Sequence, residues 1–225
     1  MSFLLATKCA PDKKILKNVK DAGIDAVELY TSKEILKDPK KVIEICKEFS
    51  LKYAIHAPND DYCPEKLAEL SIGLNASVLV IHNIYWDDEW EKLYEIFKNM
   101  KTIICIENVI SAIEQNKFVR RFNFGRCLDI EHLQIECAGV MEKEFIPVIQ
   151  EANHIHLSGY YFGSNLWHSH IHHSPEHSHS LLDLIKSARY SFMIVSEASV
   201  KHQTLDEFKK LIDNISKEIS NLKNS

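Results

Sequence analysis

The chain has few of the residues that mark domain boundaries, with six glycines and six prolines among 225 residues. They are scattered, so no glycine- or proline-rich linker and no low-complexity tract divides the sequence. A chain of this length can bury one full hydrophobic core. We therefore predict a single domain that spans residues 1–225.

Other absences exclude several classes of protein. No apolar run approaches the roughly 20 residues of a membrane-spanning helix, and the stretch Met1–Lys8 is too short and lacks the basic start of a secretory signal. The six cysteines form no C-x-x-C pair, which is typical of a reduced cytoplasmic protein. The net charge of −5 gives no general attraction to nucleic acid or anionic membranes. We expect a small-molecule substrate and no membrane partner, and nucleic acid is disfavoured.

Short apolar runs that end in a metal-ligand or acid/base side chain dominate the rest of the sequence. There are six of them: Tyr53–His56, Val78–His82, Ile103–Glu107, Arg126–Asp129, His154–His156 and Met193–Glu197. A strand that is apolar almost throughout is buried on both faces, as in a parallel sheet. The polar residue then lies at the carboxyl end of its strand, and the carboxyl ends of many parallel strands meet at one rim. That rim carries the active site in (β/α)₈ barrels.

The remaining segments complete an alternation of strands and helices. Two further strands, 3–7 and 24–30, bring the predicted set to eight, with 51–56, 78–82, 102–107, 124–129, 153–157 and 192–197. Apolar residues at helical spacing predict helices over 11–23, 39–49, 64–75, 89–100, 111–121, 142–152 and 205–221. This alternation predicts an α/β fold, a single (β/α)₈ TIM barrel. An open doubly wound sheet is the alternative, but no G-x-G-x-x-G or Walker sequence supports it.

Three of the predicted strand ends carry carboxylates, Glu107, Asp129 and Glu197. Burying them near one another would be costly through like-charge repulsion, and a divalent cation removes that cost. With His156 they form a set of carboxylate oxygens and one imidazole, which suits Mn²⁺, Mg²⁺, Co²⁺ or Zn²⁺. The sequence therefore predicts a divalent-metal site at the rim with these four residues as ligands.

Further histidines are expected near the same rim. His56 and His82 end the third and fourth predicted strands, and His132 follows Asp129 by three residues. His154 lies deeper in the seventh strand, where we expect a structural role.

A histidine-rich segment follows the seventh strand. Six of the twelve histidines fall within residues 167–179, which we expect to form a long loop. His168 and His170 are candidate ligands of a second metal or of the substrate, if the loop folds over the rim. The alternative is a polar, solvated loop, which we prefer for the other four histidines.

These motifs together resemble the xylose isomerase-like TIM-barrel superfamily, which includes sugar isomerases and epimerases and the AP endonuclease IV family. The resemblance covers essentially the whole chain. It is carried by Ile55-His56-Ala57-Pro58, Ile106-Glu107-Asn108, Asp129-Ile130-Glu131-His132, His156-Leu157-Ser158 and Ser196-Glu197. In the isomerase and epimerase branch it implies one metal, held by Glu107, Asp129, His156 and Glu197. It also implies that Glu107 and Glu197 flank the substrate as the acid/base pair.

The endonuclease IV branch implies three zinc ions instead. The additional ligands would be His56, His82, His132 and an Asp-x-His pair after the seventh strand. Here that pair is His168-Ser169-His170, without the aspartate. The family's His-Leu-Asn-Asp sequence is replaced by 156–159, His-Leu-Ser-Gly, which loses another carboxylate.

Three functions are compatible with these residues. We expect a divalent-metal-dependent isomerase or epimerase that acts on a small sugar, polyol or keto acid by proton transfer at the rim. One alternative is an endonuclease IV-like multi-zinc phosphodiesterase or AP endonuclease, and another is a non-catalytic metal-binding barrel. Trp86, Trp90 and 160–162 are candidate rim, lid or dimer contacts, so a homo-oligomer stays open.

Overall fold

Eight parallel strands form a closed barrel in the computed structural model, which describes residues 3–109, 111–139 and 143–224. Neighbouring strands pair in chain order, and the last strand pairs with the first to close the barrel. The strands are β1 (Leu4–Cys9), β2 (Ala26–Tyr30), β3 (Lys52–His56), β4 (Val78–Ile81), β5 (Ile103–Glu107), β6 (Gly125–Asp129), β7 (His154–Leu157) and β8 (Met193–Ser196). The predicted (β/α)₈ barrel is confirmed, and each strand lies within two residues of its predicted bounds.

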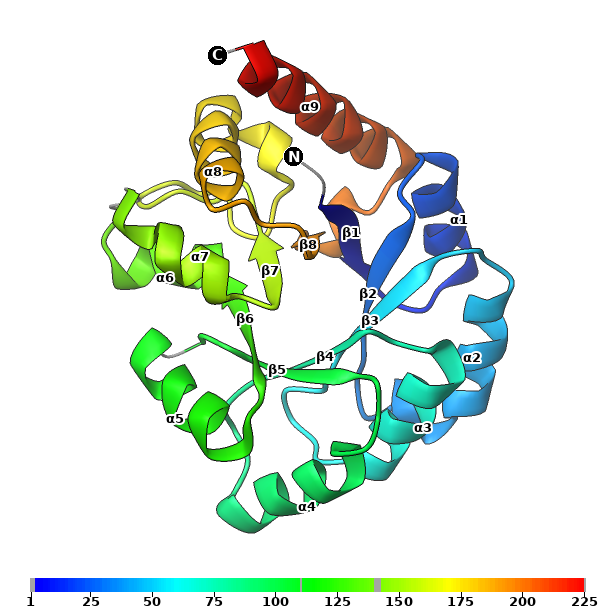
Figure 1. Ribbon diagram of the computed structural model, residues 1–225. Helices are drawn as coiled ribbons and strands as arrows, with labels where there is room; N and C mark the ends of the chain where they lie inside the picture. The colour runs from blue at the N-terminus through cyan, green and yellow to red at the C-terminus, as the bar shows by residue number, and fades with distance from the viewer. Residues whose placement is uncertain (1–2, 110, 140–142, 225) are drawn as a thin grey trace.

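Helices surround the barrel and connect successive strands (Figure 1). They are α1 (Lys13–Asp21), α2 (Pro39–Lys47), α3 (Pro64–Leu74), α4 (Asp87–Phe97), α5 (Ala112–Phe122), α6 (Ile130–Glu136), α7 (Ile146–Glu151), α8 (Pro175–Ser187) and α9 (Leu205–Asn224). Short 3₁₀ turns are η1 (Ile35–Lys37), η2 (Lys143–Phe145), η3 (Ile171–His173) and η4 (Val200–His202). The predicted helix 142–152 corresponds to η2 and α7, and residue 142 lies outside the described residues. Within the described ranges, no helix is both long and apolar enough to cross a membrane.

The prediction of a long loop over residues 167–179 is wrong for much of that segment. Residues 171–173 form η3, and α8 begins at Pro175. The buried face of α8 is carried mainly by leucines and an isoleucine that follow the histidines, including Leu181, Leu182 and Ile185. The helix was missed because its first turns are polar and its apolar stripe starts only after them. Helix α6 was also not predicted, since Asp129 caps it directly from the end of β6.

Alternating positions along each strand face the barrel interior. The lower part of the interior holds small or apolar side chains that pack as one cluster: Ala6, Ala26, Ala54, Val78, Val80, Cys105, Cys127, Met193 and Val195. Two residues further along each strand direction, the inward side chain is polar, as at Lys8, Glu28 and His56. The barrel interior is therefore apolar at its amino end and ionisable at its carboxyl end.

One residue expected at the surface belongs to the core instead. Trp90 on α4 is fully buried, and its ring lies 5.0 Å from that of Phe118 on α5. Trp90 is therefore not a rim, lid or dimer contact. Trp86, by contrast, is 77% exposed.

Candidate metal centre at the barrel rim

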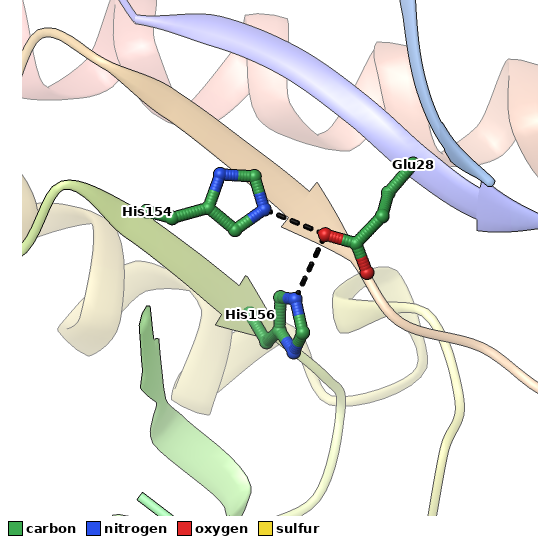
Figure 2. A group of neighbouring side chains, drawn as sticks. All are labelled: Glu28, His154 and His156. Carbon is green, nitrogen blue, oxygen red and sulfur yellow. Dashed lines mark hydrogen bonds and ion pairs between the residues drawn. The ribbon is translucent and has the colours of Figure 1, made fainter. Parts of the chain in front are cut away.

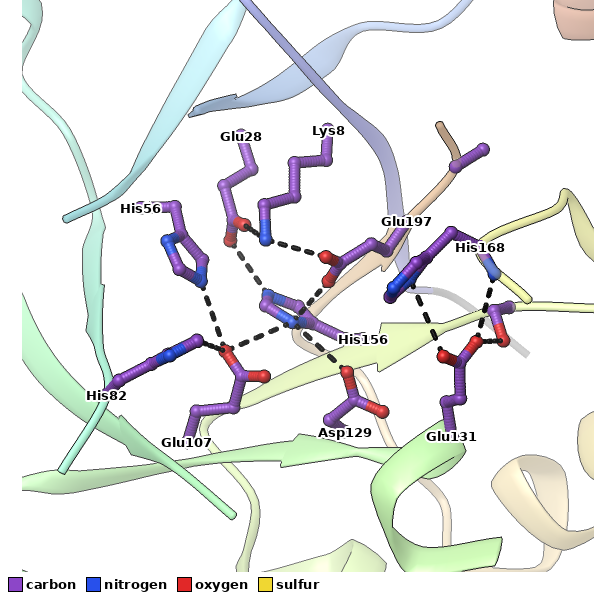
Figure 3. A network of polar contacts seen from close by, with 12 residues as sticks. Lys8, Glu28, His56, His82, Glu107, Asp129, Glu131, His156, His168 and Glu197 are labelled. Atoms are coloured by element: carbon purple, nitrogen blue, oxygen red, sulfur yellow. Dashed lines mark hydrogen bonds and ion pairs between the residues drawn. The ribbon is translucent and has the colours of Figure 1, made fainter. Parts of the chain in front are cut away.

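The four predicted rim ligands lie around one point (Figure 3). Atom Nδ1 of His156 lies 2.9 Å from Oε2 of Glu197. The same nitrogen lies 3.6 Å from Oε2 of Glu107 and 3.8 Å from Oδ2 of Asp129. The residues come from the ends of four successive strands, β5 to β8, so the barrel closure itself brings them together.

Two atoms at the centre of this group lack hydrogen bonds. Nδ1 of His156 and Oε2 of Glu197 are buried, and neither has a hydrogen-bond partner among the described residues. These two atoms lie 2.9 Å apart as an ion pair, and a bound cation would satisfy both of them in place of a proton on Nδ1. Ligands of a tetrahedral ion with bonds of about 2.1 Å lie roughly 3.4 Å apart. The distances of 2.9–3.8 Å around His156 bracket that value, and the four residues fit a divalent metal.

A carboxylate that the sequence analysis missed orients His156 (Figure 2). Glu28 is fully buried on β2, and its Oε2 accepts from Nε2 of His156 at 3.1 Å and from Nε2 of His154 at 2.7 Å. Because Nε2 of His156 donates to Glu28, Nδ1 is the nitrogen left for the rim carboxylates. A carboxylate behind a metal-binding histidine fixes its tautomer in this way. His154 is tied to Glu28 and points below the rim.

The charges around His156 govern its protonation. Burial alone would lower the pKa of His156, but the negative charges of Glu28, Glu107 and Glu197 raise it well above its usual value. In the metal-free protein a proton on Nδ1 thus supplies the positive charge that the carboxylates need. A metal ion would take the place of that proton, so proton and metal compete for one atom.

Lys8 on β1 is a second residue that the sequence analysis missed. Its Nζ lies 2.8 Å from Oε1 of Glu197 and 3.9 Å from Oε1 of Glu28. Burial raises the pKa of Glu197, but Lys8 and His156 outweigh it and hold that pKa well below its usual value. Glu197 therefore gives one oxygen to Lys8 and directs the other to the rim centre.

Two further histidines, His56 and His82, contact Glu107. Nε2 of His56 and Nε2 of His82 lie 3.1 and 3.2 Å from Oε2 of Glu107. Nδ1 of His56 lies 2.9 Å from the carbonyl oxygen of Ala57, so each ring nitrogen of His56 faces an oxygen acceptor. These three residues are thus able to hold a further metal, with Glu107 as a bridge.

The remaining candidate histidines are placed differently from one another. Nε2 of His132 lies 3.6 Å from Oε1 of Glu107, so His132 joins the rim. His168 lies at its edge, where Nδ1 is 3.6 Å from Oε1 of Glu131. His170 is buried away from the rim carboxylates, with Nδ1 2.7 Å from Oγ of Ser196 and Nε2 3.2 Å from the carbonyl oxygen of His202. The structure therefore brings His132 and His168 to the mouth of the barrel, but not His170.

A cavity of about 450 Å³ opens above these residues. Glu107 and Glu197 lie at its floor with Lys8, and Tyr30 and Val200 contribute apolar surface to its walls. This volume lies within the usual range of about 300–1,000 Å³ for sites that enclose small molecules. The site therefore combines ionised carboxylates, a buried ammonium group and a compartment of metabolite size.

Comparison with known proteins supports the fold without identifying a family. No protein-family model matches the sequence, and no curated protein matches it. Among solved structures, D-allulose 3-epimerase from Methylomonas sp. is similar with a TM-score of 0.69 and 14% identity, over 97% of this chain and 100% of that one. L-ribulose 3-epimerase is similar with a TM-score of 0.63 and 14% identity, over 100% and 96%. Phosphoribosyl anthranilate isomerase from Thermotoga maritima gives 0.56 and 15%, over 96% and 100%. At these identities the likeness shows the barrel fold alone.

Proposed function

We propose that the protein is a divalent-metal-dependent isomerase or epimerase that acts on a small sugar, polyol or keto acid. The observation that carries this proposal is the convergence of three carboxylate oxygens on Nδ1 of His156, next to a cavity that Glu107 and Glu197 line. Glu107, Asp129, His156 and Glu197 would hold the metal. A bound divalent ion would polarise the carbonyl and hydroxyl oxygens of the substrate.

Glu107 and Glu197 are the proposed acid/base pair. They come from β5 and from the residue after β8, with β6 and β7 between them, so they approach a substrate from different sides. Burial raises the pKa of Glu107, but His156 and hydrogen bonds from His56 and His82 hold it well below its usual value. Both glutamates are therefore ionised at neutral pH. One glutamate would take a proton from the carbon next to the carbonyl group, and in an isomerisation it would deliver that same proton to the neighbouring carbon. In an epimerisation the other glutamate would take up a proton from water and deliver it on the opposite face.

The size of the cavity and the similar structures support a small polyhydroxy substrate. A cavity of about 450 Å³ holds a single monosaccharide with bound water more readily than a polymer. Two of the similar solved structures are epimerases of D-allulose and L-ribulose.

A second candidate function is an endonuclease IV-like multi-zinc phosphodiesterase or AP endonuclease. It is favoured by His56, His82 and Glu107, since a carboxylate that bridges two metals suits hydrolysis of a phosphodiester. The net charge of −5 and the confined cavity argue for the small-molecule reaction.

The two functions are separated by metal content and turnover. Untagged protein would be loaded with Mn²⁺, Co²⁺ or Zn²⁺ and incubated with ketoses in D₂O, and with abasic-site DNA. We expect epimerisation or isomerisation with incorporation of deuterium at one carbon, abolished in Glu107→Gln and Glu197→Gln. Zinc-dependent cleavage of abasic DNA would instead establish the second function, if it falls as strongly in His56→Ala and His82→Ala as in the two glutamate variants. Metal binding with neither activity would leave a non-catalytic barrel.

A further inference from the structure

A second convergence of histidines lies outside the barrel mouth. Three ring nitrogens surround one carboxylate oxygen, Oε2 of Glu207: Nε2 of His173 at 2.6 Å, Nδ1 of His202 at 3.3 Å and Nε2 of His172 at 3.4 Å. The histidines come from η3 and η4, and Glu207 from the first turn of α9. None of these four residues lines the cavity above the rim. We call them the outer cluster.

His172 has no hydrogen bond that would explain its burial. Its side chain is only 10% exposed, and neither Nδ1 nor Nε2 has a hydrogen-bond partner among the described residues. A buried imidazole with both nitrogens unsatisfied costs folding free energy. Its Nε2 nevertheless points into the group formed by His173, His202 and Glu207. The unsatisfied nitrogen and its direction both point to a ligand at this place.

The charge states in the outer cluster suit a metal ion. Burial and the positive charge of His173 lower the pKa of His172 and of His202, so these two rings are neutral near pH 7, whereas His173 must release its proton before it binds a metal. Burial raises the pKa of Glu207, but a hydrogen bond and the charge of His173 lower it to about 2. Neutral imidazole and ionised carboxylate are the forms that bind metals.

The distances also fit. Tetrahedral zinc with Zn–N and Zn–O bonds of about 2.1 Å places its ligand atoms roughly 3.4 Å apart. His172 and His202 already lie at 3.4 and 3.3 Å from the Glu207 oxygen. His173 is closer, at 2.6 Å, and its side chain is 30% exposed. Ligand atoms of His172, His173 and Glu207 lie within 4.8 Å of one another, and Nδ1 of His202 would supply a fourth ligand beside the Glu207 oxygen.

We propose that His172, His173, His202 and Glu207 bind one Zn²⁺ ion in a structural site separate from the rim centre. The ion would join the connection that follows β7 to the connection that follows β8.

The second of these connections forms a wall of the cavity through Ser199, Val200 and Gln203. His170 lies between the two sites: it contacts the carbonyl oxygen of His202 and Oγ of Ser196, the residue before Glu197. The zinc would thus position the cavity wall without touching a substrate. The inference does not depend on which reaction the rim performs.

The test is a count of bound zinc in matched variants, by mass spectrometry after equilibration with a competing chelator. His172→Ala/His173→Ala removes two ligands, and Glu207→Gln keeps all histidines and the size of the side chain. His179→Ala is the control, because His179 lies in the same histidine-rich segment but pairs with Glu218 at 2.7 Å. Circular dichroism checks that each variant is folded.

We expect both cluster variants to bind one zinc ion fewer than the wild type, and the control to bind as many. Zinc affinity at this site should fall by more than about 100-fold. Substitution of residues that only hydrogen-bond to metal ligands lowers affinity by about 10–100-fold. The Co²⁺-loaded wild type should show the intense visible absorption of a four-coordinate ion, and both cluster variants should lack it. Glu107→Gln should keep that absorption. Equal zinc content in the wild type and Glu207→Gln would overturn the proposal, and so would an equal loss in His179→Ala.

Discussion

The rim centre and the outer cluster use the same kinds of side chain in opposite proportions. The rim brings three carboxylates to one imidazole nitrogen, whereas the outer cluster brings three imidazoles to one carboxylate oxygen. The rim residues end neighbouring strands and are held from behind by Glu28 and Lys8. The outer residues lie on 3₁₀ turns and at the start of a helix. The rim therefore accumulates negative charge beneath an open cavity, while the outer cluster has one carboxylate and lies outside that cavity.

This difference separates a site suited to catalysis from one suited to structure. Excess negative charge at the rim would hold a divalent cation, and the cavity would give oxygen atoms of a substrate access to it. A four-coordinate N₃O site has no open position. The predictions below are ordered by the size of the effect expected on this contrast.

The largest contrast concerns turnover. Glu107→Gln and Glu197→Gln should each lower kcat by at least about 10²–10⁴-fold, because each removes a proton-transfer group as well as a metal ligand. Glu207→Gln should change kcat by less than about tenfold. Steady-state kinetics with the best ketose of the panel measures both effects. A loss of turnover in Glu207→Gln as large as that in Glu107→Gln would abolish the distinction between the two sites.

The next effect tests the support behind His156. Glu28→Gln keeps the shape of the side chain but removes the charge that fixes Nε2 of His156, so metal affinity at the rim should fall about 10–100-fold. Zinc affinity of the outer cluster should not change. Competition with a chromophoric chelator gives both affinities in one titration. An unchanged metal affinity at the rim would mean that Glu28 serves only as the hydrogen-bond acceptor of His154 and does not orient His156.

The two sites should also differ in their dependence on pH. The pKa of His156 is raised, so metal binding to Nδ1 must displace a proton, and rim affinity should rise about tenfold per pH unit below that pKa. The pKa values of His172 and His202 are lowered, so neither of these rings should release a proton when zinc binds above pH 7. Calorimetry in two buffers of different ionisation enthalpy counts the protons released. Release of one proton at the outer cluster and none at the rim would reverse the assignment.

The same shift of His156 predicts how the stability of the metal-free protein depends on pH. A raised pKa stabilises the folded state fully below the ordinary histidine pKa of about 6.5, and this contribution is lost as the pH rises through the folded value. The free energy of unfolding of the chelator-treated protein should therefore fall from about pH 6.5 upward. In Glu28→Gln, where the positive charge on His156 is less favoured, that fall should be smaller. Urea titrations at several pH values measure it.

The smallest effect is on melting temperature. Zinc at about 100 times its Kd stabilises the protein by ~2.7 kcal/mol, or about 5–10 °C for a chain of this size. The part of this shift that arises at the outer cluster should vanish in Glu207→Gln and persist in His179→Ala. Differential scanning calorimetry with and without zinc compares the two. A shift of equal size in both variants would show that the outer cluster adds no stability.

The sequence was sufficient to predict the barrel and which side chains meet at its rim because both depend on short-range patterns. Each strand is a short apolar run, and its inward side chains recur every two residues. The same alternation could have located Lys8 and Glu28, since each lies two residues beyond an inward alanine, Ala6 and Ala26. They were missed because neither stands at the predicted end of its strand.

The outer cluster could not be predicted in this way. His173 and Glu207 are 34 residues apart, and His172 and His202 are separated by similar lengths of chain. Their meeting depends on the conformations of two connections and on where α9 begins. The roles of neighbouring histidines diverge for the same reason: His168 adopts a positive φ of 44°, so the chain turns there and His170 points away from the rim. The spacing of the histidines in the sequence does not predict this turn.

The most direct test of the account is an anomalous difference map from crystals grown with Zn²⁺ or Mn²⁺, recorded on both sides of the metal's absorption edge. The account predicts a peak about 2.1 Å from Nδ1 of His156 and from oxygens of Glu107, Asp129 and Glu197. That peak should disappear in Glu107→Gln crystals grown in the same way. A map with metal peaks elsewhere but none among these four residues would contradict the central claim that the rim is a metal centre.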